Sequence, residues 1–170
     1  MMDLRVGLQI EGEPIPQPRP RARARRVPCG QYRGTVYDPP GRIVEWRAHV
    51  VATLTADRLR AERRGMVLPY TWPLEAHINL EFSRPASHYR NRDPERGLVQ
   101  GAPAFPSRKR EGDADNLAKC IMDDLVVSGW LEDDALIVDL KITKRWAEDG
   151  QTGSAFVGLY GLGLGSGMID

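Results

Sequence analysis

Three segments of the chain alternate apolar and polar residues, a pattern typical of β-strands with one buried face. Because successive side chains of a strand point to opposite faces, the apolar set of each segment predicts which side meets the core. The strands are predicted at residues 4–10, 74–82 and 135–143, with core-facing residues Val6, Leu8 and Ile10; Ala76, Ile78, Leu80 and Phe82; and Val138, Leu140 and Ile142, respectively.

Two further segments repeat apolar residues at helical spacing. The first covers residues 42–63 and carries arginines on its other side, so we expect a scaffold helix. The second can be capped at its start by Asp113 or Asp115 and is closed by Gly129, a residue type favoured just after a helix. The predicted core-facing residues are Val44, Ala48, Val51, Leu54 and Leu59 in the first helix, and Leu117, Ile121 and Leu125 in the second.

Two long segments have no usable period and are predicted to be loops. Residues 14–40 are rich in proline, arginine and glycine, and residues 83–112 contain four prolines and lead directly into the second helix. Loops of this length are usually functional or disordered, so a solvated tail remains an alternative for 14–40. The glycine-rich end is expected to fray, most clearly over residues 161–170.

Length and composition indicate one domain spanning residues 1–170. With 41% apolar residues the chain can bury a core of its own. The two cysteines, Cys29 and Cys120, cannot form a disulfide framework, and the three histidines are scattered without a zinc pattern. His77 lies on the outward side of a predicted strand. We therefore expect a cytoplasmic protein that is neither exported nor membrane-spanning, since no long apolar run is present.

The near-neutral total charge of +1 hides a strong segregation of charge. Residues 19–33 contain six arginines and no acid, and residues 84–110 carry a net charge of +5. Residues 111–139 contain nine acids and a single base, Lys119. Arginine suits phosphate oxygens and clustered carboxylates suit hard divalent cations, so the pattern indicates nucleic acid held beside Mg²⁺ or Mn²⁺.

The second helix is expected to present the acids of this region on one stripe. Asp115, Lys119 and Asp123 are spaced four residues apart, which makes them neighbours on a helix surface. Asp113 lies in the non-helical lead-in and can turn toward the same point. Asp134 stands at the entrance of the third strand, where an acid could complete a metal site that begins at the helix start.

The Asp-x-Asp spacing by itself is a weak signal, because a capped helix with a solvated acidic face would show it too. An EF-hand is excluded because Leu117 and Ala118 stand where a ligand and a glycine are needed. An aspartyl-phosphate phosphatase would need a buried apolar strand before the motif, and the chain has a basic segment there. A nucleotide-sugar transferase would need a glycine-rich strand-to-helix turn, which does not precede the motif.

The motif closely resembles the signature of the RusA-like Holliday junction resolvases, endodeoxyribonucleases common in bacteriophages and prophages. The matching residues are Asp113, Asp115, Asn116, Leu117 and Lys119, then Asp123, and then Gly129, Trp130, Leu131, Asp133 and Asp134. Outside residues 113–144 the resemblance is looser and covers a first strand, an arginine-rich loop and a helix opening near Glu45. Residues 97–106 stand out as an insertion.

The resemblance implies an α+β domain with a small mixed sheet and flanking helices, and a function in DNA recombination and repair. It implies Asp113, Asp115, Lys119 and Asp134 as catalytic residues. The three aspartates among them would bind Mg²⁺ or Mn²⁺, together with Asp133. It also implies a homodimer that cuts paired strands of four-way DNA junctions. Both arginine-rich loops are expected to hold DNA backbone, through Arg19, Arg21, Arg23, Arg25, Arg26, Arg108, Lys109 and Arg110.

Two alternatives remain open at this stage. The first is a DNA-binding protein that keeps the fold and has lost cutting, although all four implied catalytic residues are present. The second is a nuclease that prefers flaps or replication forks to four-way junctions. The sequence does not separate these substrates, and it does not indicate a preferred cutting sequence.

Overall fold

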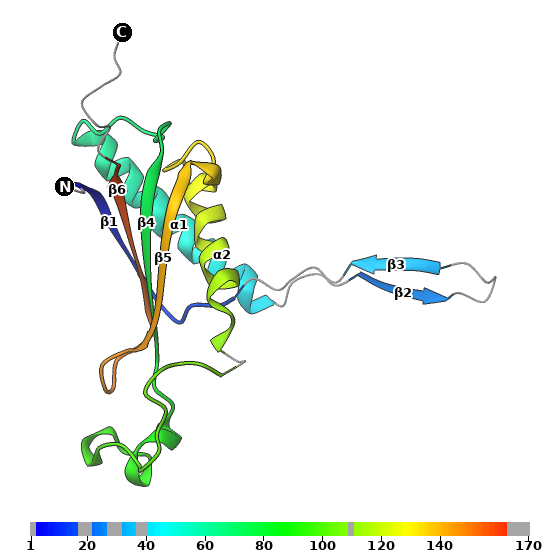
Figure 1. The fold of residues 1–170 in the computed structure, drawn as a ribbon, viewed down its shortest axis with the longest axis vertical. Helices are drawn as coiled ribbons and strands as arrows, with labels where there is room; N and C mark the ends of the chain where they lie inside the picture. Colours follow the sequence, from blue (N-terminus) through cyan, green and yellow to red (C-terminus); the bar gives the residue numbers. More distant parts are fainter. Residues whose placement is uncertain (1–2, 17–21, 27–31, 37–40, 109–110, 163–170) are drawn as a thin grey trace.

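The computed structural model describes residues 3–16, 41–108 and 111–162, together with the backbone of 22–26 and 32–36. Its centre is a four-stranded mixed sheet in the order β1-β6-β4-β5 (Figure 1). β4 and β5 run parallel, whereas β6 runs antiparallel to both β1 and β4. The elements are β1 (Asp3–Glu11), β2 (Ala22–Arg26), β3 (Tyr32–Val36), α1 (Gly41–Arg63), β4 (Leu74–Phe82), α2 (Ala114–Val127), β5 (Ile137–Trp146) and β6 (Ser154–Gly161).

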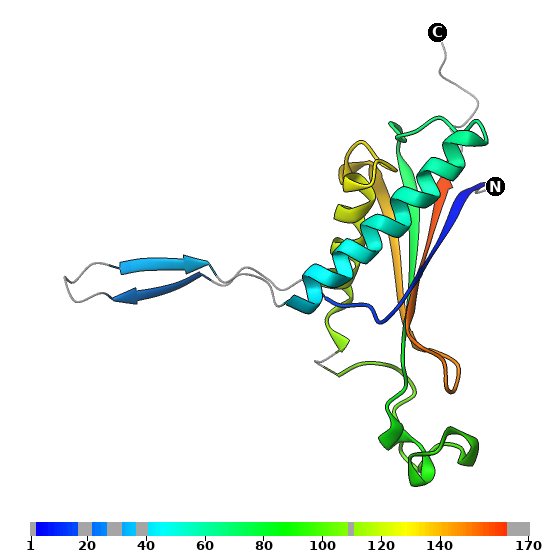
Figure 2. The same ribbon diagram turned by 180° about the vertical axis from the view of Figure 1, so that it is seen from behind.

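Both helices pack against the same face of this sheet and enclose the core. α1 crosses the sheet obliquely, while α2 lies toward β5, and no helix of the described residues covers the opposite face of the sheet (Figures 1 and 2). The alternation predicted for β4 is confirmed, since Ala76, Ile78, Leu80 and Phe82 are all buried. The face predicted for α2 is confirmed as well, because Leu117, Ile121 and Leu125 are buried in the same core. The chain is therefore a single small α+β domain with a mixed sheet, as predicted.

The face of α1 that meets the core differs from the prediction. Its buried residues are Ile43, Trp46, Val50 and Leu54. Val44 and Leu59, which were assigned to the core face, are 55% and 42% exposed. Apolar residues occur on more than one side of this helix, and the bulky Trp46 side chain is part of the stripe that packs on the sheet. The periodicity alone selected the wrong stripe, and Leu54 is the one predicted residue that is fully buried.

A local irregularity also changes the start of β5. Leu74 pairs with Ile137 and the next residue, Glu75, pairs with Asp139, so Val138 falls at a bulge. Val138 is 60% exposed, in contrast to its predicted place in the core. Leu140 and Ile142 pack against the core, as predicted. An extra residue in one strand reverses the alternation locally, which a strict two-residue period cannot anticipate.

The predicted loops contain more regular structure than expected. Residues 14–40 include β2 and β3, which pair as an antiparallel hairpin, so the prediction of a loop was wrong there. Within 83–108 the chain forms short 3-10 helices, η1 (Ala86–His88), η2 (Arg90–Arg92) and η3 (Pro94–Arg96). The predicted fraying from residue 161 was also wrong at its start, because Gly161 closes β6 and is buried. Residues 163–170 lie outside the described part of the chain.

Candidate nuclease site

Lys119 connects the acidic stripe of α2 to the turn that precedes β5. Its Nζ atom donates hydrogen bonds to Asp123 Oδ1 at 2.7 Å and to Asp134 Oδ2 at 3.3 Å. These hydrogen bonds raise the pKa of Lys119 above its ordinary value, with Asp123 contributing more than Asp134. The lysine is therefore a stable cation at neutral pH. Its side chain is 56% exposed, so this charge lies at the surface, where a large substrate can reach it.

The two acids of the turn before β5 have different roles in the structure. Asp134 begins the 3-10 helix η5 (Asp134–Leu136) and turns its carboxylate toward Lys119. Asp133 is the cap of the same short helix, and its Oδ1 atom accepts a hydrogen bond from the Ala135 amide at 2.8 Å. Of the pair, Asp134 is thus the acid that joins the α2 stripe, and its catalytic role stays a prediction.

The Asp-x-Asp segment lies at the start of α2, on the surface. Asp113 is the residue before the first helical turn, and its carboxylate accepts a long hydrogen bond of 3.5 Å from Asn116 Nδ2. Its side chain does not cap the helix backbone, although we had predicted that either Asp113 or Asp115 could. Both Asp113 and Asp115 are exposed. Acids near a helix N-terminus are favoured by the helix dipole, so this placement stabilises two negative charges without burying them.

The backbone leading into Asp113 is held by residues that sequence reasoning missed. Lys144, on β5, donates a hydrogen bond from Nζ to the Gly112 carbonyl at 2.6 Å. Gly112 has a φ of +76°, and a Cβ atom there would lie 2.5 Å from the side chain of Pro16. A residue with a side chain would therefore be both strained and obstructed. The sequence shows a glycine directly before the motif, but its neighbours Lys144 and Pro16 come from distant parts of the chain and could not be predicted.

A second missed feature is an ion pair that joins the two helices. Asp124 is fully buried on α2, and Arg47 of α1 donates to its Oδ1 atom from Nε at 2.9 Å and from Nη2 at 2.6 Å. Burial raises the pKa of the Asp124 carboxyl, and Arg47 limits this rise by stabilising the charged form. The acid next to Asp123 is therefore structural. From the sequence, Asp124 counts among the nine acids of residues 111–139. Only its contact with Arg47 reveals that its side chain faces the interior.

The predicted metal ligands are not gathered at one point. Among the described residues, no group of three or more His, Cys, Asp and Glu side chains is arranged so that it could hold a metal ion. The donor chemistry nevertheless fits a hard divalent cation, because Asp113, Asp115, Asp133 and Asp134 offer carboxylate oxygens at the surface. Their role as metal ligands stays a prediction.

Most of the predicted DNA-binding residues fall where side chains are not described. Arg19, Arg21, Lys109 and Arg110 lie outside the described residues. Arg23, Arg25 and Arg26 belong to β2, of which the structure describes the backbone. Arg108 is exposed, close in sequence to the start of α2. Their contacts with DNA therefore remain a prediction.

The basic segment before α2 is folded onto the end of the sheet. Trp146 donates from Nε1 to the Pro103 carbonyl at 2.9 Å, and the Arg84 guanidinium lies 5.3 Å from the centre of its ring. Tyr89 donates a hydrogen bond to Asp149 Oδ1 at 2.6 Å, and burial together with this contact raises the pKa of Tyr89 to about 12. The segment is thus anchored to the sheet end at Trp146 and to the following loop at Asp149. The predicted insertion, residues 97–106, includes its anchoring residue Pro103.

The fold is that of an α+β protein, with a mixed sheet and two helices on one face. Its exposed stripe of carboxylates with one lysine forms a surface site that suits a phosphate-rich substrate. The model of the family "Endodeoxyribonuclease RusA" matches residues 11–153, which is most of the chain. The chain therefore belongs to the RusA family of endodeoxyribonucleases. A comparison with curated proteins gives no match.

The family match confirms the resemblance that the motif indicated. It implies an endodeoxyribonuclease that resolves Holliday junctions and therefore acts on branched DNA. The matched range includes both arginine-rich segments, α2 and the acidic turn before β5. Within the described residues, no helix is long and apolar enough to cross a membrane.

Proposed function

We propose that this protein is a divalent-metal-dependent, structure-selective nuclease that cuts paired strands of four-way DNA junctions. The observation that carries the proposal is the contact of Lys119 with both Asp123 and Asp134. This contact brings the acids of the turn before β5 to the helix that begins with the Asp-x-Asp motif. Two motifs that are separate in sequence thereby form one exposed, polar surface.

Asp113, Asp115 and Asp134 would hold Mg²⁺ or Mn²⁺, with Asp133 as a further ligand. When bound, the ion would supply positive charge to the phosphate at which the strand is cut. Exposed carboxylates suit this role because they need no buried counter-charge before the ion arrives. Repulsion among them would be relieved when a cation binds, so the metal is expected to draw their side chains together.

Lys119 has a separate task in the proposed reaction. Its raised pKa keeps it protonated, so it cannot serve as a base that activates water. A cation at this position would instead stabilise the negative charge that develops on the phosphoryl oxygens as water attacks the phosphorus. Asp123 is its neighbour on the helix and would keep the lysine directed along the stripe when Asp134 turns toward a metal ion.

A homodimer would match the symmetry of the substrate. A four-way junction that is resolved by two symmetric cuts requires two sites related by a two-fold axis, and an isologous dimer provides them. The arginines of residues 19–26 and of 108–110 would contact the DNA backbone, which fixes the position of the junction without reading its bases.

The proposal is tested with Asp115→Asn and the matched control Asp139→Asn, an exposed acid on β5 that pairs with Glu75 of β4 and is not part of the stripe. With Mg²⁺ present, Asp115→Asn should abolish cutting of a synthetic four-way junction while junction binding persists or tightens, since repulsion of phosphate is reduced. Asp139→Asn should cut normally. Cleavage and gel-shift assays on the junction and on a linear duplex, each with and without Mg²⁺, measure both outcomes. Cutting retained by Asp115→Asn would refute the assignment of the site, and binding without cutting by the unchanged protein would favour a non-catalytic role.

A further inference from the structure

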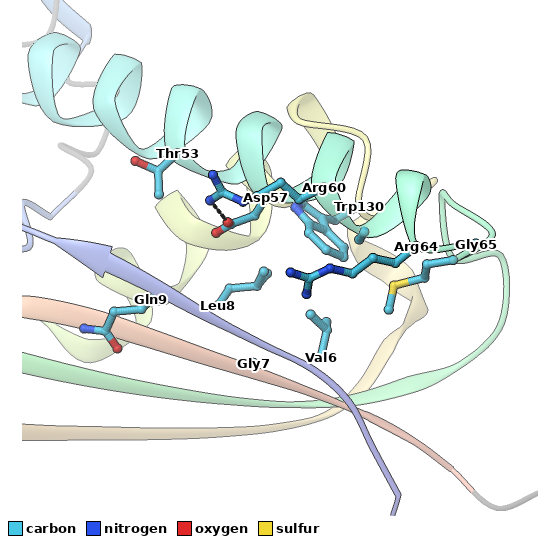
Figure 3. Close-up of a pocket in the computed structure, with 12 residues that line it drawn as sticks. Val6, Gly7, Leu8, Gln9, Thr53, Asp57, Arg60, Arg64, Gly65 and Trp130 are labelled. Atoms are coloured by element: carbon cyan, nitrogen blue, oxygen red, sulfur yellow. Dashed lines mark hydrogen bonds and ion pairs between the residues drawn. The ribbon is translucent and has the colours of Figure 1, made fainter.

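A groove runs along the edge of the sheet opposite to the nuclease site. Among the described strands β1 pairs with β6 alone, so its outer edge is open, whereas the acidic stripe lies toward β5 at the other edge. The groove lies between this open edge and the C-terminal half of α1, and its volume is about 650 Å³ (Figure 3). It therefore belongs to a different surface from the one assigned to DNA cutting.

One face of α1 forms the polar wall of the groove. This face carries four residues that line the groove at spacings of three or four positions, namely Thr53, Asp57, Arg60 and Arg64. Arg60 donates a hydrogen bond to Asp57, so these two charges largely satisfy each other. Arg64 reaches across the groove toward β1 in Figure 3, and it has no acidic partner in the part of the chain that the structure describes. As far as the described residues go, the Arg64 guanidinium is thus available to a ligand.

The floor of the groove is apolar and fixed. Leu8 and Trp130 line it and are almost fully buried, and the Trp130 indole donates from Nε1 to the Leu54 carbonyl at 2.9 Å. Residues from both faces of β1 contribute to the lining, Val6 and Leu8 from one and Gly7 and Gln9 from the other. Since side chains of a strand alternate, contributions from both faces mean that the backbone edge of β1 itself borders the groove.

We propose that this groove binds an extended acidic peptide of a partner protein, which adds as a further strand to β1. The open backbone of β1 would supply main-chain hydrogen bonds, as in strand addition at other sheet edges. Alternate side chains of the peptide would then enter the groove, an acidic one beside Arg64 and an apolar one against Val6 and Met66, which line the groove and are only partly buried. Nucleic acid suits the groove less well, because its phosphates gain nothing from backbone carbonyls or from an apolar lining.

The test uses a fluorescein-labelled peptide, Asp-Thr-Leu-Thr-Asp-Thr, and fluorescence anisotropy with the whole chain. Arg64→Glu should weaken binding at least about tenfold, because it places a like charge beside the peptide carboxylate. Arg63→Glu is the matched control. Arg63 is exposed on the same helix turn but does not line the groove, so this variant should change affinity less than about twofold. Junction cutting should be unchanged in both variants, which separates this inference from the proposed nuclease function.

Strand addition has a signature that charge alone does not produce. Of two peptides methylated on alternate backbone amides, only the one whose methyl groups face β1 should lose binding. Equal weakening by Arg63→Glu and Arg64→Glu, or equal binding of both methylated peptides, would overturn the proposal. A fall in molecular mass of the protein on adding peptide, measured by sedimentation, would place a second copy of this chain in the groove and would overturn it as well.

Discussion

At the scale of single residues, the site depends on which acids are turned outward and which are already engaged. Asp133 caps η5 and Asp134 meets Lys119, although they are adjacent and chemically identical. Asp123 lies on the exposed stripe, whereas its neighbour Asp124 is fully buried against Arg47. In each pair, one acid is engaged by the backbone or by Arg47, and its neighbour contacts Lys119 at the surface.

Lys119 is the residue at which this distinction is most directly testable. Replacing it with alanine should lower the rate of junction cutting by several orders of magnitude, because one charge-stabilising donor in an active site is worth about 10²–10³ and the lysine also organises two acids. Its exposed ion pairs should contribute about 0–1 kcal/mol, so the thermal midpoint should hardly move. Single-turnover cleavage rates and thermal unfolding measure the two quantities.

Arg63→Ala is a suitable control for this variant, since it removes one exposed positive charge outside the stripe. It should cut at the normal rate. If Lys119→Ala also cuts normally, or if it unfolds at the working temperature, then the lysine is only a helix-face residue and has no part in the reaction.

At the scale of elements, α2 is held against α1 by the Arg47–Asp124 ion pair as well as by apolar packing. The Arg47–Asp124 contact lies one residue beyond Asp123, and therefore it fixes the rotation of the helix that carries the stripe.

The free thiol of Cys120 lies beside the Asp124 carboxylate, with Sγ 3.9 Å from Asp124 Oδ2. Burial raises the pKa of this thiol to about 12, so Cys120 stays protonated and inert in the interior.

Removing one partner of this ion pair should cost more than removing both. Arg47→Ala leaves a buried carboxylate without its counter-ion, which typically costs about 3–5 kcal/mol and should cost less here because Arg47 is 35% exposed. The double variant Arg47→Met with Asp124→Leu should be close to neutral, since apolar groups of similar size can replace a buried pair. Urea unfolding of the single and double variants measures the difference. A double variant that is less stable than Arg47→Ala would contradict this account.

At the scale of the whole molecule, acids and bases are separated along the chain and the acids gather toward one edge of the sheet. The segment before α2 is folded back on Trp146, the last residue of β5. The arginines of residues 19–26 are expected to act together as a source of positive charge. Such contacts bind any DNA shape and depend on salt, because each phosphate that is neutralised releases counter-ions.

Replacing Arg23, Arg25 and Arg26 together by alanine should therefore weaken binding to junctions and linear duplexes alike. The slope of log affinity against log salt should fall by about 0.9 for each phosphate contact that is lost. Titrations at several salt concentrations measure the slope, and titration with Mn²⁺ checks that metal binding is intact. If neither the affinity nor the slope changes, these arginines form a solvated segment and the DNA is held by the basic residues before α2.

Features that arise from local spacing could be predicted from the sequence alone. The core face of α2 follows from Leu117, Ile121 and Leu125, and the alternation of β4 follows from four apolar residues in a strict period. The family, too, could be identified from a motif of residues that are close together in the chain. In all these cases neighbours in sequence are neighbours in space, so the pattern carries the information.

Tertiary structure decided what depends on partners far away in the chain. The face of α1 is set by the sheet and α2, which accept Ile43 and Trp46 and leave Val44 exposed. A bulge opposite Leu74 turns Val138 outward. Asp124 is buried because Arg47 approaches it from another helix. A residue's own spacing cannot reveal these outcomes, because burial of an apolar face or a charge is a free-energy difference that depends on which groups surround it after folding.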